Sequence, residues 1–323
     1  MSEIRYDLIT GKRVIIATER GKRPHDFNVN YEGKKNNNTC PFCPMNEEMT
    51  PPTLVEIKDK KGNWLVRGFE NKFAAVNRDL KSFEVPSLYK AEYGYGVAEV
   101  IVESPEHDVT FGSLSLGQMQ KVFMAIIERY KKIAQDDKIK YIQVFKNFGA
   151  RGGASLEHGH WQIIAISFIP DVVEKEVTGT QEYIKKKGKC PYCEIVKYEK
   201  EEGKRIIAEN ESFIIIAPYA SQYPYESWVM PKEHQERFEE LREGNIASLT
   251  EILKPLIEKY EKEFNLPPYN IVIHTLPISD IRNYHWHIEI IPRLTVAAGF
   301  ELGTGVYINP VPPELAASVL RIE

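Results

Sequence analysis

The sequence contains the same arrangement of cysteines and histidines twice. In each half a Cys-x-x-Cys pair is followed by a single histidine and then by a His-x-His, and the interval from the single histidine to the His-x-His is 51 positions in both halves. The residues are Cys40, Cys43, His107, His158 and His160 in the first half, and Cys190, Cys193, His234, His285 and His287 in the second. This repetition predicts an internal duplication, in which each unit holds a metal and presents one free imidazole.

Length and composition are those of a globular protein with two units. A chain of 323 residues exceeds one ordinary core and suits two repeats of about 150 residues. The net charge of −4 provides no basic field for nucleic acid, and no apolar run approaches the ~20 residues of a membrane span. All four cysteines belong to the Cys-x-x-Cys pairs, which favours thiolate ligands in a reducing compartment. We therefore expect a cytoplasmic protein that binds neither nucleic acid nor membrane.

Apolar patterns predict the same order of elements in both halves. Runs at 72–76 and 212–217 predict buried strands, and a second strand in each half ends in a turn that carries the single histidine. Long amphipathic helices are expected at 116–134 and 246–264. Each helix is followed by a strand, a loop and another strand, which the His-x-His begins.

These elements predict an α+β fold of two tandem domains, each an antiparallel sheet with one covering helix. The expected boundaries are 1–170 for the domain with the active site and 171–323 for the repeat. The segment from about Pro170 to Lys189 is expected to be the connector, with a lysine-rich end that is solvated.

Two thiolates at Cys-x-x-Cys spacing can occupy two corners of a tetrahedron around zinc. The matching histidines complete each set, so the expected ligands are Cys40, Cys43, His107 and His158 at one site and Cys190, Cys193, His234 and His285 at the other. A redox pair or two small buried side chains would also account for a Cys-x-x-Cys, but not for the matching histidines. Four protein ligands leave no open position, so both zinc ions are expected to be structural.

His160 is the expected nucleophile. It follows an expected metal ligand by two positions and shares a strand face with Gln162, because alternate side chains of a strand point the same way. A free, neutral imidazole can attack phosphorus, and the glutamine amide can donate to a phosphoryl oxygen. The glycine-rich loop Asn147–Ser155 can bring backbone N–H groups and the Ser155 hydroxyl to a phosphate. His287 lacks the glutamine and the glycines, so we expect the second repeat to be catalytically silent.

Near the N-terminus, Arg20, Lys22 and Arg23 place three cations within four positions. They can form a clamp for a sugar phosphate or diphosphate. A solvated basic turn is the alternative, and the sequence does not decide between the two.

These features resemble the galactose-1-phosphate uridylyltransferase family of the histidine-triad superfamily, including its ADP-glucose phosphorylase branch. The likeness runs from Arg5 almost to the end of the chain and is most specific at Arg20-Gly-Lys-Arg23-Pro, Cys-Pro-Phe-Cys, Ser104-Pro-Glu-His107, Asn147 to Gln162 and Gly299-Phe-Glu-Leu-Gly. It implies two histidine-triad-like domains and a nucleotidyl group carried by His160, with Gln162 at its phosphate. It also implies nucleotide contacts from Asn77, Asn147 and Ser155 and phosphate contacts from Arg20 and Arg23.

The C-terminal region adds a subunit prediction and two departures. Phe300 and Glu301 match positions that the family uses toward the hexose, often from the neighbouring subunit, which implies a homodimer. The family's uridylyltransferases usually have proline between the two histidines and a glutamine in the C-terminal hexose motif, whereas this chain has Gly159 and Gly303-Thr-Gly-Val-Tyr307. The run from Gly299 and the second Cys₂His₂ set are more similar to the ADP-glucose phosphorylase branch.

The sequence thus predicts a ping-pong hexose-1-phosphate nucleotidylyltransferase acting on a nucleoside diphosphate hexose through a nucleotidyl-His160. The acceptor is a hexose 1-phosphate in this prediction, and inorganic phosphate in the alternative, an ADP-sugar phosphorylase. The base and the sugar are left open. A nucleotide hydrolase of the same superfamily and a non-enzymatic, zinc-stabilised binding module are the alternatives of other classes.

Overall fold

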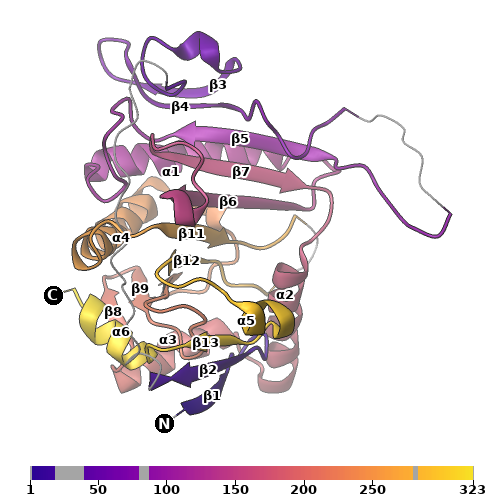
Figure 1. Cartoon of the computed structure of the whole chain (residues 1–323), viewed down its shortest axis with the longest axis vertical. Helices are drawn as coiled ribbons and strands as arrows, with labels where there is room; N and C mark the ends of the chain where they lie inside the picture. Colours follow the sequence, from indigo (N-terminus) through magenta and orange to yellow (C-terminus); the bar gives the residue numbers. More distant parts are fainter. Residues whose placement is uncertain (1, 19–39, 80–86, 279–282, 323) are drawn as a thin grey trace.

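The computed structural model describes residues 2–18, 40–79, 87–278 and 283–322. Its main element is a ten-stranded antiparallel sheet with helices packed on it (Figure 1). The strands of the first half are Thr53–Lys58 (β3), Trp64–Glu70 (β4), Gly96–Val102 (β5), Tyr141–Phe148 (β6) and His160–Ile166 (β7). Those of the second half are Ile206–Glu209 (β8), Phe213–Ile216 (β9), Ser227–Pro231 (β10), Tyr269–His274 (β11) and His287–Pro292 (β12). The order across the sheet is β3-β4-β5-β7-β6-β11-β12-β10-β9-β8.

The two halves of this sheet meet where β6 pairs with β11, with Phe148 opposite Tyr269 and Val144 opposite Ile273. Counted outward from this junction, the strands run β6, β7, β5, β4, β3 on one side and β11, β12, β10, β9, β8 on the other, so both halves have the same topology. The prediction of an α+β fold built from a repeated unit is confirmed. The structure adds that the two predicted sheets are joined edge to edge into one.

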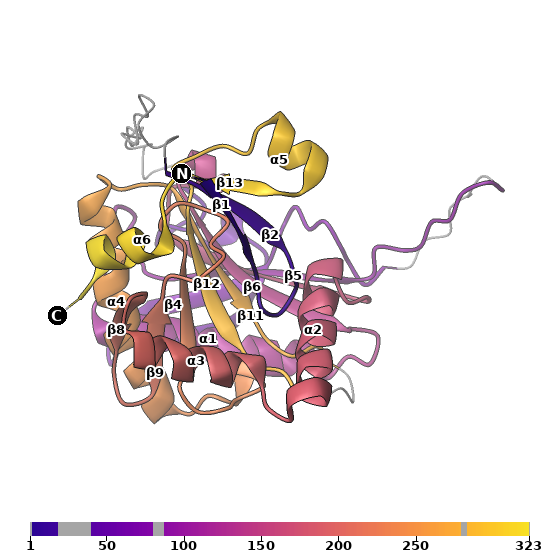
Figure 2. The ribbon, with the colours of Figure 1, turned by 90° about the horizontal axis from the view of Figure 1, so that it is seen from below.

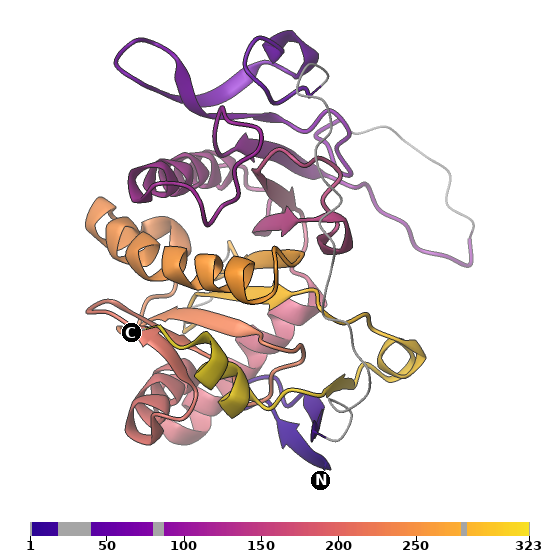
Figure 3. The same ribbon diagram turned by 60° about the vertical axis from the view of Figure 1, so that its left-hand side comes forward.

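Helices α1 (Leu116–Ile133) and α4 (Glu243–Glu263) lie side by side on one face of the sheet (Figure 3). Their positions agree with the predicted helices at 116–134 and 246–264. The side chain of Ser115 caps α1 by accepting a hydrogen bond from the Gln118 N–H, which satisfies one of the free donors at the start of a helix. The apolar face of each helix is buried against the sheet, as its spacing predicts.

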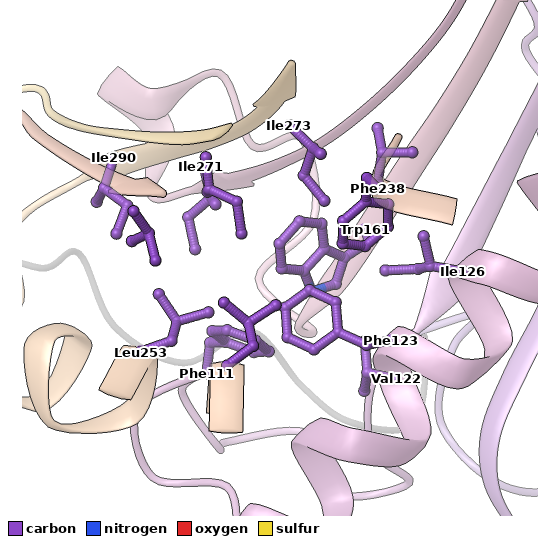
Figure 4. Close-up of a cluster of buried hydrophobic side chains, with 14 of the residues drawn as sticks. Phe111, Val122, Phe123, Ile126, Trp161, Phe238, Leu253, Ile271, Ile273 and Ile290 are labelled. Carbon is purple, nitrogen blue, oxygen red and sulfur yellow. The ribbon is translucent and has the colours of Figure 1, made fainter. Parts of the chain in front are cut away.

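The main hydrophobic core fills the space between these two helices and the sheet (Figure 4). Trp161 of β7 packs edge-on against Phe111 and Phe123, with ring centroids 5.4 and 5.6 Å away. Phe123 in turn lies 6.1 Å from Phe238 of the second half. Edge-to-face contacts of this kind stabilise a core beyond the burial of the rings themselves. Because one core includes side chains of both halves, the division into 1–170 and 171–323 stays a prediction.

The ends of the described chain form a second, three-stranded sheet from Ser2–Tyr6 (β1), Arg13–Ala17 (β2) and Tyr307–Asn309 (β13) (Figure 2). β1 is antiparallel to β2, and β13 is parallel to β2. Arg5 of β1 donates hydrogen bonds to both carboxylate oxygens of Glu314 and to the Tyr219 carbonyl, at 3.0, 3.1 and 3.1 Å. These contacts attach the N-terminal strands to the second half of the protein.

The remaining helices surround this framework. They are α2 (Asp171–Lys187), α3 (Pro191–Glu202), α5 (Gly299–Thr304) and α6 (Pro313–Leu320), with short 3₁₀ turns at Glu47–Met49, Ala150–Gly152 and Phe238–Glu240. Across the described ranges, no helix combines the length and the apolar character that a membrane crossing requires.

Two sequence-based expectations need correction or extension. The strand predicted at 72–76 is wrong, because this segment leaves the sheet after β4 and is irregular and largely exposed, with Phe73 87% exposed. The first-half counterpart of β9 is β4, whereas the strand predicted at 212–217 is confirmed as β9. The connector predicted at about 170–189 is the helix α2, and its lysines are exposed as expected.

Candidate active site

The structure brings the first predicted set of metal ligands together near the start of β7. Cys40 and Cys43 lie in a turn closed by a backbone hydrogen bond of 3.3 Å from the Cys43 N–H to the Cys40 carbonyl. His107 follows β5, and His158 lies two residues before the start of β7. Nδ1 of His158 lies 3.6 and 3.5 Å from the Sγ atoms of Cys40 and Cys43, and Nδ1 of His107 lies 3.2 Å from Cys43 Sγ. All four side chains point their ligand atoms toward one another within 4.8 Å.

These distances fit a tetrahedral metal centre. Sulfur and nitrogen ligands at two corners of a tetrahedron around zinc are separated by about 3.5 Å, given metal distances of ~2.3 and ~2.0 Å. The outer nitrogen of His158, Nε2, donates to the Ser104 carbonyl at 2.8 Å, which leaves the lone pair of Nδ1 facing the thiols. His158 can therefore bind a metal ion through Nδ1 without reorienting its ring.

The second predicted set is also assembled, at the start of α3. Nδ1 of His285 lies 4.0 and 3.5 Å from the Sγ atoms of Cys190 and Cys193, and Nδ1 of His234 lies 3.5 Å from Cys193 Sγ. Nε2 of His285 donates to the Pro231 carbonyl at 3.0 Å, in the same way as at the first set. His234 is exposed and both cysteines are half-buried, so this group lies closer to solvent than the first.

His160 begins β7 on the same face as the first metal group. Its Nδ1–H donates to the carbonyl of His158 at 2.8 Å, and its ring packs edge-on against Phe42 of the Cys-x-x-Cys turn, 5.2 Å between centroids. Burial lowers the pKa of His160 to about 4, so the ring is neutral at pH 7. The proton therefore sits on Nδ1, and Nε2, which has no hydrogen-bond partner among the described residues, carries a free lone pair. This is the protonation state that a nucleophile requires.

The glycine-rich loop lies next to His160, as the sequence predicts. It forms a short turn at Ala150–Gly152 flanked by Gly149 and Gly153, whose φ angles of 72° and 84° favour glycine. Ser155 is exposed on the way to β7, and Gln162 is partly exposed on the His160 face of that strand.

Asn270, which the sequence does not point to, hydrogen-bonds to this loop. It lies on β11, and its side-chain amide donates to Asn147 Oδ1 at 2.8 Å and to the Gly152 carbonyl at 2.7 Å. Asn147 is thereby oriented by a residue of the second half. No spacing in the sequence reveals this contact, because it depends on the pairing of β6 with β11.

The other predicted substrate residues are not beside His160. Asn77 bridges to Tyr95 and hydrogen-bonds Gly96, which pairs with Ile166 at the opposite end of β7 from His160. It lines a cavity of about 210 Å³ together with Asn71, whose backbone N–H bonds to Ala98. Arg20 and Arg23 lie outside the described residues.

Phe300 and Glu301 are in α5, far along the chain from the glycine loop. Figures 1 and 2 show α5 beside β13 rather than beside β7. Phe300 is half-exposed, and Glu301 accepts a hydrogen bond from the Ala298 N–H at 3.0 Å, which caps α5. Within one chain these two residues therefore do not reach His160, and their role toward the hexose stays a prediction that needs a second subunit.

His287 occupies the place in the second half that His160 has in the first. Its ring packs against Tyr192, Trp228 and His274, with centroids 5.0, 5.1 and 4.9 Å away, and it is only 1% exposed. Its Nε2 faces the carboxylate of Glu289 at 3.8 Å rather than open space. This packing supports the prediction that the second repeat is catalytically silent.

A third group of ligand-type side chains surrounds His287 and was not found by sequence reasoning. Its members are Glu176, His274, His287 and Glu289, whose donor atoms lie within 4.8 Å of one another. Nδ1–H of His274 and the hydroxyl of Tyr284 both donate to Glu176, at 2.9 and 2.7 Å. Because these atoms already satisfy one another, we interpret the group as a buried charge pair within the core. The sequence does not reveal this group, because Glu176 lies in the predicted connector, far along the chain from His274, His287 and Glu289.

Replacing Glu176 by glutamine should lower the stability in a pH-dependent way. Burial alone would raise the pKa of Glu176, but His274 lowers it to about 2; burial would lower the pKa of His274, but Glu176 and Glu289 raise it to about 9. The pair therefore contributes fully between the ordinary values of about 4.5 and 6.5, and its contribution is lost as pH rises through 9.

We expect Glu176→Gln to reduce the free energy of unfolding by roughly 3–5 kcal/mol near pH 6, because a buried charge loses its partner. Chemical denaturation of the variant and the wild type at pH 6 and above pH 9 measures this. The difference between them should be smaller at the higher pH. An equal difference at both would contradict the assignment of the charge pair.

Comparisons with known proteins agree with this architecture. Residues 1–170 match the sequence model for "Galactose-1-phosphate uridyl transferase, N-terminal domain", and residues 102–321 match a domain of unknown function, DUF4921. ADP-glucose phosphorylase of Arabidopsis thaliana is 37% identical, over 99% of this chain and 92% of its own length. Galactose-1-phosphate uridylyltransferase of Thermotoga maritima is 30% identical, over 99% and 98%.

The crystal structure of the Arabidopsis thaliana ADP-glucose phosphorylase with bound ADP-glucose superposes with a TM-score of 0.87 at 36% identity, covering 100% of this chain and 99% of the other. The matches extend over both halves and include the repeated sheet that positions His160. The chain belongs to the galactose-1-phosphate uridylyltransferase family.

Proposed function

We propose that this protein is a nucleotidyltransferase that carries a nucleotidyl group on Nε2 of His160. The observation that carries the proposal is the state of that ring: its Nδ1–H is held by the His158 carbonyl, its pKa is low, and its second nitrogen has a free lone pair beside a glycine-rich loop. Such an imidazole attacks phosphorus readily and leaves it again in a second step.

The reaction has two steps through a phosphoramidate. In the first, the Nε2 lone pair of His160 forms a bond to the α-phosphorus of a nucleoside diphosphate hexose. The bond from that phosphorus to the bridging oxygen breaks, and hexose 1-phosphate leaves with the electron pair. In the second, an acceptor phosphate oxygen attacks the same phosphorus and the P–N bond breaks. Gln162, which is partly exposed on the His160 face of β7, is suited to donate to a phosphoryl oxygen as the charge on that oxygen grows.

Both Cys₂His₂ groups are proposed to hold zinc. Thiolates and imidazoles at tetrahedral separations are the ligands that zinc prefers, and all four cysteines are free thiols. When bound, zinc supplies a structural anchor rather than a catalytic water, because four protein ligands fill its coordination. His158 at one end of the loop and Cys40 and Cys43 next to Phe42 then hold the surroundings of His160. Free thiolate ligands of this kind also support a reducing, cytoplasmic location.

The donor we propose is ADP-glucose, with inorganic phosphate as the acceptor. Similarity supports this choice, because the ADP-glucose phosphorylase of Arabidopsis thaliana is 37% identical over 99% of this chain, against 30% for the uridylyltransferase of Thermotoga maritima. Gly159 between the histidines agrees with it. Uridylyl transfer from UDP-glucose to a hexose 1-phosphate is the second candidate, and the match of residues 1–170 to the uridyl transferase domain favours it.

A homodimer of two-domain subunits is proposed as the active form. Phe300 and Glu301 lie on α5, where Phe300 is half-exposed and Leu302 is 77% exposed, and the segment extends beside β13 without covering a site of its own chain. An exposed apolar segment of this kind is suited to contact a second subunit. Arg20 and Arg23 are proposed to bind the phosphates of the nucleotide. Asn77 stays a prediction for the nucleotide itself, because within one chain it lies at the opposite end of β7 from His160.

Intact-protein mass spectrometry tests the function. The protein is mixed with ADP-glucose or UDP-glucose without an acceptor, and the His160→Asn variant is treated in parallel. An AMP adduct that phosphate discharges as ADP supports the phosphorylase, and a UMP adduct that galactose 1-phosphate discharges supports the uridylyltransferase. Steady release of the mononucleotide without acceptor would indicate a hydrolase instead. No adduct and no release with either donor would overturn the proposal and favour a non-enzymatic binding module.

A further inference from the structure

A buried ion pair lies directly behind the His158–His160 segment. Nζ of Lys146 on β6 lies 2.9 Å from both carboxylate oxygens of Glu103, which follows β5. Lys146 is 1% exposed and Glu103 is fully buried. The ammonium lies 5.6 Å from the Phe111 ring, in the core beside Trp161, on the face of the sheet opposite to His160. The cost of removing both charges from water offsets most of their attraction, so a pair this deeply buried contributes little to the net stability of the fold. Stability alone therefore does not explain why the pair is present.

The ion pair contacts the His158–His160 segment at Gly159. A Cβ atom at Gly159 would lie 2.1 Å from Oε1 and 2.8 Å from Cδ of Glu103, so the carboxylate fills the space that any side chain between the two histidines would need. The backbone is joined there too, because the Glu103 N–H donates to the Gly159 carbonyl at 3.2 Å. The absence of a side chain at this position and the buried pair are therefore two parts of one arrangement.

The pair also joins the other elements that define the site. Lys146 precedes Asn147 of the glycine loop, and the carbonyl of Glu103 accepts a hydrogen bond from Gln118 near the start of α1 at 2.8 Å. The next carbonyl, of Ser104, accepts from His158 Nε2. Movement of Glu103 would therefore shift the His158–Gly159 segment that leads into His160, and also Lys146, the residue before Asn147 of the glycine loop.

We propose that the Lys146–Glu103 pair is the positioning element of His160, acting through the Gly159 backbone, and that it is the reason that glycine lies between the two histidines. The inference rests on the proposed function of His160. The pair touches neither substrate nor the reacting atoms. It fixes the height of the His160 ring above the sheet, and a misplacement of about 1 Å at a reacting group can slow a step roughly 100-fold.

The first test removes the charges but keeps the volumes, in the variant Glu103→Gln/Lys146→Met. We expect adduct formation at saturating donor to slow about tenfold or more, with the concentration of donor at half-maximal rate, the zinc content and the melting temperature close to those of the wild type. The matched control is Glu99→Gln/Arg129→Met, which removes a second bidentate pair, formed at 2.7 and 2.8 Å between Glu99 of β5 and Arg129 of α1 and lying away from His160. Its adduct rate should stay within about twofold of the wild type.

The second test is a cycle around Gly159. Gly159→Ala should slow adduct formation roughly 100-fold in the wild-type background. In the Glu103→Ala/Lys146→Met background, which clears the space, the same substitution should slow it less than about threefold. Equal effects of Gly159→Ala in both backgrounds, or a Glu103→Gln/Lys146→Met variant as fast as the control, would overturn the proposal. If the wild type itself forms no adduct, the function of His160 fails first, and this inference fails with it.

Discussion

Replacement of His160 by asparagine is expected to lower the rate of nucleotidyl transfer by roughly 10⁵-fold or more, because loss of a covalent nucleophile removes both steps of the reaction at once. Asparagine keeps a polar group of similar reach on β7, so the strand should pair as before. Steady-state phosphorolysis or uridylyl transfer measures the loss, and zinc content and melting temperature show whether the fold is kept. A variant that retained more than about 1% of the activity would mean that another group carries the nucleotide.

His287→Asn is the matched control, since His287 holds the same position in the second repeat. We expect its transfer rate to stay within about threefold of the wild type, because its ring is enclosed by Tyr192, Trp228 and His274. Its stability should fall by roughly 1–3 kcal/mol, as the ring contacts and the hydrogen bond to the His285 carbonyl weaken. A loss of transfer as large as that of His160→Asn would contradict the assignment of a silent second site.

The two Cys₂His₂ groups could be predicted from the sequence because they depend on short-range spacing and on repetition. A Cys-x-x-Cys and a His-x-His each fix their own geometry, and the equal intervals in both halves linked the distant histidines to them. The spacing of apolar residues predicted the helices α1 and α4, whose apolar faces are continuous. The structure therefore agrees with the sequence for the two Cys₂His₂ groups and for the two long helices.

The predictions that failed or were missed depend on contacts between distant segments. The apolar run at 72–76 has the composition of a strand, but no neighbouring strand is available to it once β4 has taken the place beside β5. Asn270 and Asn147 meet only because β6 and β11 join the two halves. Glu103 and Lys146 are ordinary charged residues in the sequence, and only their burial behind Gly159 gives them a role.

Cys43→Ser is expected to remove the metal of the first site and with it both stability and activity. Zinc binding contributes roughly 10–16 kcal/mol in small zinc domains, so even partial dependence predicts a loss on the order of 5 kcal/mol and a melting temperature lower by about 10 °C or more. His158 and the Cys40–Cys43 turn flank His160 through the His158 carbonyl and Phe42. Loss of their anchor should therefore lower transfer at temperatures where the chain remains folded.

Cys193→Ser tests whether the two sites differ as their surroundings suggest. The second group holds α3, His234 and His285, none of which contacts His160, and His234 is exposed. We expect this variant to lose one zinc per chain and to unfold at a lower temperature, while transfer below that temperature stays within a few-fold of the wild type.

A chelator should remove zinc from the more exposed group, that of Cys193, before it removes zinc from the other, because solvent reaches the ligands of the exposed group. Elemental analysis during chelation, with activity measured on the same samples, distinguishes the two sites. Activity that falls as the first zinc is lost would mean that the exposed group supports the catalytic half. The two repeats would then depend on both metals together.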